Sequence, residues 1–339
     1  MMEQGEDLTR YESEIAQFAF ELDNSVIDQD DEGELVNRAG SGFQLVQRFQ
    51  NLATQEVERC RKLQENGDGD ATEVQQELKH WELEHQTWEL FSRLAEHRMR
   101  EATGPQDIPD TLARNRFLSN KHIRDYLYEN HPKFRELWLV LDWLQVYAPM
   151  PVEELVARDG QLKADAGWMY TREKIKGEKR KGKQPVFSHG FGHKGKDHGV
   201  KTLDPDAPTR EQKRLESEDE VADRLLMKTV WRLLRRGDIS AAQVLCEESG
   251  EWWRAASLSG GEESWDEVID GPTAHDGDET MDGSALRAKG NKRRELWKRM
   301  CYALARRPEV DTYEKAVYGA LCGDIESVSI LPPGTTPNC

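Results

Sequence analysis

One glycine-rich segment holds two patterns that could do chemistry on a ligand. Residues 190–195 spell GxGxxG, the turn that cradles phosphates in dinucleotide-binding folds. That turn needs a preceding strand and a following helix whose N-terminus receives the phosphate, whereas a lysine-rich coil follows here. Three histidines of the same segment could crowd a metal ion: His189, His193 and His198. A flexible segment must lose entropy before it can coordinate a metal, so we expect a solvated loop with no cofactor and no metal.

Three further motifs suggest chemistry but have a simpler interpretation. Glu77-x-x-His80 and Glu82-x-x-His85 have the ExxH spacing of di-iron carboxylate bundles. Those sites take their two motifs from different helices, whereas both motifs here fall on one helix and on diverging faces. Arg236-Gly237-Asp238 copies an integrin-binding motif. A helix C-cap followed by an N-cap explains the same three residues. Because no nucleophile elbow, P-loop or HExxH motif occurs either, the sequence predicts no catalytic residue and no enzyme.

Composition indicates a helical protein with wide solvated faces. The chain has 339 residues, 64 acidic against 47 basic side chains, a net charge of −17, and ten tryptophans to build a core. The acidic excess argues against nucleic acid as the main partner, because phosphates attract basic surfaces. No apolar run of about 18 residues and no apolar leader occur, so we expect neither a transmembrane span nor a secretory signal. Five scattered cysteines favour reduced thiols in an intracellular compartment: Cys60, Cys246, Cys301, Cys322 and Cys339.

The elements that would position any site are helices. Strand-type alternation is almost absent, and apolar residues recur at three- and four-residue steps in 8–36, 42–66 and 72–102. The stretch 132–146 is apolar nearly all round, which predicts a central helix buried between neighbours. From residue 222 onward, short helices alternate with tight turns and end in a long basic helix and a final short one. We therefore predict an all-α fold, an irregular helical stack or α-solenoid.

Two segments of opposite charge interrupt this pattern. Residues 171–202 are predicted to form a basic flexible loop, with ten basic against three acidic residues in 171–201. Residues 259–284 are predicted to form an acidic flexible loop with nine acidic residues and no basic one. An alternative function follows from the first segment: an anion-binding module that uses 171–201 on nucleic acid or membrane. Aromatic residues are few there, and charge runs are usually solvated.

Four stretches occur in an order that is familiar from one protein family. They are residues 111–146, LDPDAPTR at 203–210, WRLLRRGDISAAQVLCEESGEWWRAASLSG at 231–260, and KGNKRRELWKRMC at 289–301. Together they resemble the nucleoporin 84/107 family, whose members are scaffold subunits of the Y-shaped complex of the nuclear pore. Each stretch alone is weak, but four in order with matching gaps make the resemblance specific over roughly 110–325.

The resemblance implies a fold, a place and partners. It implies a coat-like helical stack that doubles back on itself, one elongated domain over 1–339, and a location at the nuclear pore complex in the nuclear envelope of the nucleus. It implies structural assembly that supports nucleocytoplasmic transport and mRNA export, with no small-molecule substrate and with nucleic acid and membrane unlikely as direct partners. The family's amino-terminal part pairs with a 145C/96-type nucleoporin, itself bound to a small β-propeller subunit. A 133-type nucleoporin docks on a carboxy-terminal part, which we expect this amino-terminal portion to lack.

Within the matched stretches, we expect some residues to be structural and others to face the partner. The expected structural core comprises Trp253, Arg254, Ala255, Ala256, Asn291, Leu296, Trp297 and Cys301, with Arg254 tying a loop carbonyl. The candidate partner interface is Leu225, Met227, Trp231 and Leu234. An interface centre needs apolar side chains, but one face of that helix must also pack inward. The sequence does not separate its inner face from its outer face.

Overall fold

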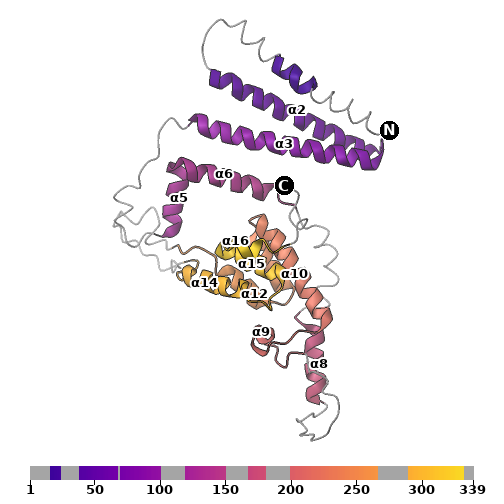
Figure 1. Ribbon diagram of the computed structural model, residues 1–339, viewed down its shortest axis with the longest axis vertical. Helices are drawn as coiled ribbons and strands as arrows, with labels where there is room; N and C mark the ends of the chain where they lie inside the picture. Colours follow the sequence, from indigo (N-terminus) through magenta and orange to yellow (C-terminus); the bar gives the residue numbers. More distant parts are fainter. Residues whose placement is uncertain are drawn as a thin grey trace, which may run out of the picture. The chain divides into compact units, whose positions relative to one another are not determined.

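The described part of the computed structural model is helical. It comprises residues 16–23, 38–67, 69–100, 119–149, 167–180, 199–265 and 289–331. Within these ranges, the β-type pairing is limited to isolated bridges, so the prediction of an all-α fold is confirmed for this part of the chain. The chain divides into two compact units, Met1–Ile108 with Tyr126–Trp143 and Pro109–Asp125 with Leu144–Cys339 (Figure 1). A single elongated domain over 1–339 stays a prediction.

A hairpin of two long helices, α2 (Arg38–Asn66) and α3 (Ala71–Arg100), forms most of the first unit. Gly67 and Gly69 turn the chain at φ values of 71° and 91°, in the left-handed region that favours glycine. The Asp70 carboxylate then accepts a hydrogen bond of 2.9 Å from the Thr72 amide and caps α3. These local signals place the turn where the sequence predicts the break between two helices.

The hairpin buries a narrow core because its apolar residues recur at helical spacing. Its buried members are Ala53, Val57, Cys60 and Trp81, with Phe18, Leu52, Leu78 and Trp88 packed against them. Polar contacts flank this core, with Arg59 pairing with Glu77 at 2.5 Å and Arg61 with Glu82 at 3.0 Å. The glutamates of both ExxH motifs therefore pair with arginines of α2.

Two shorter helices follow, α5 (Asn120–Asn130) and α6 (Pro132–Val146). Pro132 opens α6, as the sequence predicts. Within the first unit, α6 lies against α3 through a 3.0 Å hydrogen bond from the Trp143 indole to the Gln86 carbonyl. No residue of α6 is buried, so the prediction of a buried central helix is wrong in this structure.

Eight helices of the described residues belong to the second unit. They are α8 (Met169–Arg180), α9 (Ala207–Glu211), α10 (Ser217–Arg235), α11 (Ile239–Glu248), α12 (Trp252–Ser259), α14 (Arg294–Ala305), α15 (Thr312–Cys322) and α16 (Ile325–Val328). Between α10 and α11, Gly237 adopts a φ of 75° and Asp238 accepts a 2.9 Å bond from the Ala241 amide. The RGD sequence is thus the cap pair that the sequence predicts, with Arg236 donating to the Ala148 carbonyl.

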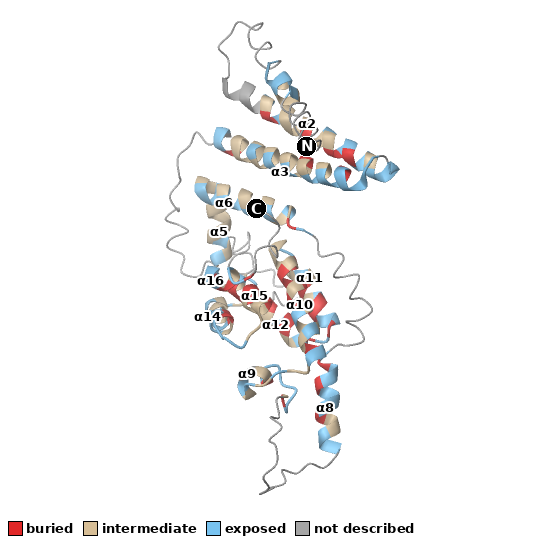
Figure 2. Cartoon of the chain, turned by 45° about the vertical axis from the view of Figure 1, so that its right-hand side comes forward, coloured by how far each residue is buried: buried red, intermediate tan, exposed pale blue. Residues whose placement is uncertain are grey.

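The core of the second unit gathers on α10, α11, α12 and α15 (Figure 2). Its most deeply buried apolar side chains are Leu226, Met227, Val230, Ala242, Cys246, Leu258, Ala316 and Val317. Helix α15 packs against α10 and also against α14 and α16, although α10 lies about 90 residues earlier in the chain. The helices next to each other in sequence, α10, α11 and α12, pack as successive neighbours.

The two predicted loops need correction. Residues 171–180 are helical in α8, because the buried Asp219 carboxylate accepts bonds from the Thr171 and Tyr170 amides and Ile175 is buried. Residues 181–198, with the GxGxxG pattern and the three histidines, lie outside the described residues. In the acidic segment, residues 260–265 are ordered by bridges to 289 and 291, and 266–288 lie outside the described residues. Among the described helices, none is long and apolar enough to cross a membrane.

Candidate partner-binding surface

Two residues of the predicted partner interface lie in the core. Met227 is 1% exposed and Trp231 is 5% exposed, both within the central cluster of the second unit. Leu225 is half-buried and Leu234 packs against the same cluster. The physical reason is that α10 is covered by α8, α11 and α15, so more than one of its faces turns inward. Met227 and Trp231 cannot meet a partner unless the core opens, so their place in the predicted interface needs correction, whereas that of Leu225 and Leu234 stays a prediction.

The residues of the predicted structural core differ in burial. Arg254, Ala255 and Cys301 are buried, as expected. Leu296 is 53% exposed, and Ala256 is also exposed. Both side chains therefore lie on a face of their helix that its neighbours leave uncovered. The apolar character of Leu296 therefore does not report burial.

Trp253, Asn291 and Trp297 are half-buried, and the last two connect α12 with α14 and the residues before it. The Trp253 ring lies 4.5 Å from the Arg254 guanidinium, a cation–π contact. The Trp297 indole donates a 2.8 Å hydrogen bond to the Ser257 carbonyl, and the side-chain amide of Asn291 donates one of 3.0 Å to the Gly260 carbonyl. A Cβ on Gly260 would lie 2.3 Å from the Trp297 ring, so glycine is required there. These contacts join the stretch 231–260 to the stretch 289–301.

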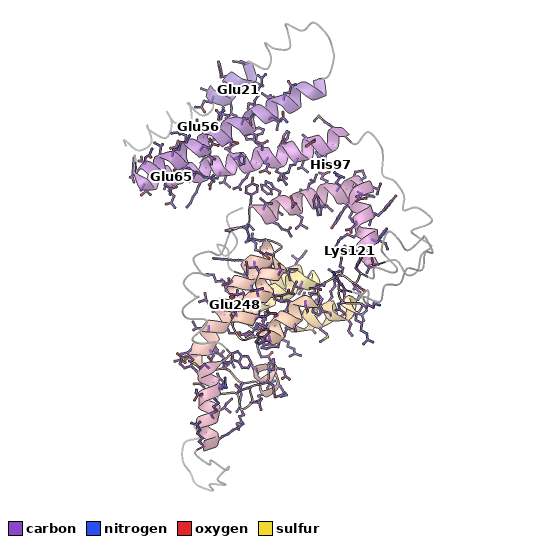
Figure 3. The ribbon with its side chains drawn as sticks, turned by 180° about the vertical axis from the view of Figure 1, so that it is seen from behind. Glu21, Glu56, Glu65, His97, Lys121 and Glu248 are labelled. Carbon is purple, nitrogen blue, oxygen red and sulfur yellow. The ribbon has the colours of Figure 1, made fainter. Side chains whose placement is uncertain are left out.

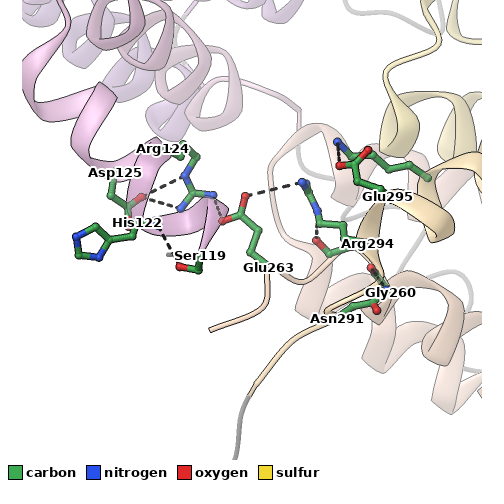
Figure 4. Close-up of polar contacts among 11 residues, drawn as sticks. Ser119, His122, Arg124, Asp125, Gly260, Glu263, Asn291, Arg294 and Glu295 are labelled. Carbon is green, nitrogen blue, oxygen red and sulfur yellow. Dashed lines mark hydrogen bonds and ion pairs between the residues drawn. The ribbon is translucent and has the colours of Figure 1, made fainter. Parts of the chain in front are cut away.

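A polar clasp of three charged residues, Arg124, Glu263 and Arg294, lies beside these contacts (Figure 4). The Glu263 carboxylate accepts a hydrogen bond from Arg124, which also pairs with Asp125 at 2.8 Å. On its other side, the same carboxylate lies 3.9 Å from Arg294, whose Nε donates to the Gly261 carbonyl at 2.9 Å. The sequence places Glu263 in a solvated acidic loop. Its role was missed because its partners lie 139 and 31 residues away.

Arg254 itself has an environment that differs from the prediction. Instead of a loop carbonyl, its guanidinium pairs with three carboxylates. Asp223 lies at 2.6 Å and Glu314 at 3.0 Å, and Glu251 contacts the Arg254 Nε. Burial raises the pKa of Glu251 to about 7 and that of Tyr318, on the same cluster, to about 12. Arg254 therefore joins α10, α12 and α15 through charge.

The longest exposed apolar stripe of the first unit runs along α6. Phe134, Leu137, Trp138 and Leu141 recur at the three- and four-residue steps of one helical face. Their exposed fractions are 40%, 66%, 44% and 46%, high for side chains of this size. We call these four residues the α6 stripe. Contiguous apolar patches rimmed by charge mark protein–protein contacts, so the α6 stripe is the candidate partner-binding surface.

The basic residues of α8 are less suited to an anion. Lys174 pairs with Glu216 at 2.5 Å, and Lys176 pairs with Glu173 at 3.1 Å. Such pairs are weak at the surface, but they reduce the positive potential that phosphates would meet. Among the described residues, no cluster of three or more metal-ligating side chains occurs.

The chain is similar to known proteins over most of its length. Residues 78–331 match the family described as nuclear pore protein 84 / 107. Nucleoporin nup107 of Schizosaccharomyces pombe is 31% identical over 284 residues, covering 84% of this chain and 30% of that protein. Nucleoporin NUP84 of Chaetomium thermophilum is 30% identical over 364 residues, covering 95% and 36%. Human nuclear pore complex protein Nup107 is 26% identical over 297 residues, covering 87% and 30%. The chain spans about a third of the length of these relatives.

Proposed function

The chain belongs to the nuclear pore protein 84 / 107 family, and we propose that it is a scaffold subunit of the nuclear pore Y-complex. The family is structural and non-enzymatic, and its members are nucleoporins of the nuclear pore complex. The family match over residues 78–331 is the observation that carries the proposal. Since the chain spans a third of its relatives, the activity and partners of the whole protein are part of what is proposed.

The partner of this portion is a 145C/96-type nucleoporin that carries a small β-propeller subunit. The family resemblance supports this pairing, and a 133-type nucleoporin would use a carboxy-terminal part of the family's length. The assembled scaffold would support nucleocytoplasmic transport and mRNA export. No catalytic step and no cofactor enter this mechanism, which is geometric: a stiff helical body holds one docking surface at a fixed angle to others.

A coat-like stack that doubles back on itself would supply that stiffness. The packing of α10, α11 and α12 as successive neighbours supports a stack. The return of α15 onto α10 supports a chain that folds back, because it joins helices that are remote in sequence. Caps at Asp238 and Asp311 terminate the helices sharply and keep the connections short.

The α6 stripe is the surface that we assign to the 145C/96-type partner. A stable contact between two proteins buries about 1,200–2,000 Å² in total, with large apolar side chains at its centre. The α6 stripe offers four such side chains, including a tryptophan and a phenylalanine, the residue types that interface centres favour. Charged residues at its margin, such as Arg135 and Lys133, would form the polar rim.

Binding of a 145C-type nucleoporin fragment, measured by calorimetry at low and high salt, tests both parts of the proposal. We expect one-to-one binding that persists at high salt, because a mainly apolar interface is little screened. The double variant Leu137→Asp with Leu141→Asp should weaken binding at least a hundredfold while the far-ultraviolet circular dichroism stays unchanged. Leu83→Asp is the matched control, since Leu83 is an exposed leucine on another helix of the same unit.

Each other outcome has a definite meaning. Binding that is unaffected by the double variant would keep the partner and reject the α6 stripe as its site. A double variant that loses stability before it loses affinity would indicate that the stripe packs against another part of the same chain. Absence of binding by the unaltered chain would reject the partner. Affinity for duplex DNA or anionic vesicles that falls steeply with salt would favour the anion-binding module instead.

A further inference from the structure

The buried guanidinium of Arg254 is outnumbered by the carboxylates around it. We call Arg254, Asp223, Glu251 and Glu314 the Arg254 cluster. Arg254 is 3% exposed, and the side chains of the three carboxylates are between 7% and 14% exposed. With every group ionised, one positive charge would face three negative charges in a nearly dry site. A buried excess of charge is costly, and the least costly remedy is protonation of a carboxylate.

The contacts point to the carboxyl group that takes the proton. Asp223 and Glu314 each accept a well-placed hydrogen bond from Arg254, at 2.6 Å and 3.0 Å. Glu251 touches the Arg254 Nε, but neither that Nε nor the Glu251 Oε2 completes a hydrogen bond within the described residues. Since hydrogen bonds to the charged form favour ionisation, the carboxyl group without such a bond is the one that takes a proton at least cost.

The other groups facing the cluster add little positive charge to it. Tyr318 of α15 interacts electrostatically with Arg254, and Asp311, which caps α15, interacts electrostatically with Glu314. Asp311 also lies 3.6 Å from Arg224 of α10. From α11, the thiol of Cys246 faces the cluster, and burial raises its pKa to about 12, so it stays neutral. Among the described residues, Arg254 is the only buried cation at this site.

We propose that Glu251 holds a proton at neutral pH, and that this proton locks α10, α12 and α15 together. When the proton leaves, the cluster gains a second uncompensated negative charge and the three helices hold each other less tightly. The second unit is therefore a pH-sensitive body whose cohesion is greatest on the acidic side of neutrality. Scaffold function does not require such a device, and the inference is independent of the partner proposed above.

The direction of the pH dependence follows from linkage. Burial raises the pKa of Glu251 from 4.5 to about 7 in the folded state, and burial also raises the pKa of Glu314. Between these pH values, the folded state holds a proton that the unfolded state has released, so stability falls as the pH rises. The contribution is complete below about pH 4.5 and is lost above about pH 7. The folding equilibrium constant should change by one to two orders of magnitude across this window.

The test compares the whole 339-residue chain with Glu251→Gln in urea unfolding at several pH values between about 5 and 8. Glutamine is neutral at every pH, so the variant should lose this part of the pH dependence. The folding constant of the unaltered chain should fall ten- to a hundredfold more than that of the variant. Glu248→Gln is the control, because Glu248 is an exposed glutamate on the neighbouring helix (Figure 3). Glu248→Gln should show the same fall of the folding constant with pH as the unaltered chain.

A spectroscopic measurement keeps the proposal refutable if the variant does not fold. Protonated carboxyl groups have a separate infrared carbonyl band, which the unaltered chain should show at about pH 6 and lose at about pH 8. Equal pH dependence in the unaltered chain and Glu251→Gln would overturn the proposal. Absence of the carbonyl band at about pH 6 would overturn it as well.

Discussion

Gly290→Ala tests the close approach of two chain segments between α12 and α14. Gly290 has a φ of 76°, and a Cβ built there would lie 2.0 Å from the Glu263 carbonyl oxygen. That oxygen belongs to the backbone, so no side-chain rotation can relieve the overlap. The bridges on either side of Gly290 must therefore open if alanine is accommodated.

The cost can be worked out from the bonds that would be lost. Residues 265 and 289 exchange two backbone hydrogen bonds of 2.9 Å and 2.8 Å, and the backbone amide of Asn291 donates a third, of 3.0 Å, to the Glu262 carbonyl. At about 1 kcal/mol each, loss of two or three bonds costs about 2–3 kcal/mol. The positive φ adds about 1 kcal/mol for alanine. We expect Gly290→Ala to lower the free energy of unfolding by about 3–4 kcal/mol.

Gly323→Ala separates the two contributions. Gly323 has a φ of 84° at the end of α15, in the same unit, but a Cβ there meets nothing within 4 Å. This variant should lose only the conformational term, about 1 kcal/mol. The assay is urea unfolding, with hydrogen exchange to show that Gly290→Ala loses protection first at 262–265 and 289–291. Equal losses in the two variants would refute the close approach and the reasoning built on it.

Two further substitutions probe the second unit. Trp231→Ala should lower the free energy of unfolding by about 3–5 kcal/mol, as expected for a large buried aromatic side chain. Thermal unfolding should show that stability falls before partner affinity does. A stable variant that no longer binds the partner would restore Trp231 to the interface. Asp238→Ala should lower the free energy of unfolding by about 1 kcal/mol, because the N-cap of α11 is lost. Asp238→Asn should lower it less, because the amide oxygen can still accept the hydrogen bond from the Ala241 backbone amide. Equal melting temperatures of the unaltered chain and Asp238→Ala would contradict the cap.

The residues that sequence reasoning misplaced share one property. Trp231 and Leu296 are both apolar residues on amphipathic helices, and periodicity identifies a helix without saying how many of its faces are covered. Helix α10 is covered by three others and buries Trp231, whereas α14 leaves Leu296 exposed. In α6, the same kind of sequence leaves six large apolar side chains exposed to solvent.

The long basic helix predicted for 285–307 shows a second limit. In the described residues, α14 begins only at Arg294, because Lys289 and Asn291 form bridges with Trp265 and Glu263. Helix propensity favours continuation of the helix through this stretch. The bridging partners lie 24 and 28 residues earlier, and their effect appears only when the chain is folded.

By itself, the sequence determined the helical class, most helix ends and the family. Those features are local: a cap needs Asp238 beside Gly237, and a family motif needs residues in order along the chain. The tertiary structure decided which faces are buried and which charges meet. Asp223, Glu251, Arg254 and Glu314 converge only because α10, α12 and α15 pack together. Burial and charge balance depend on groups distant in sequence, and no local pattern encodes which of them become neighbours.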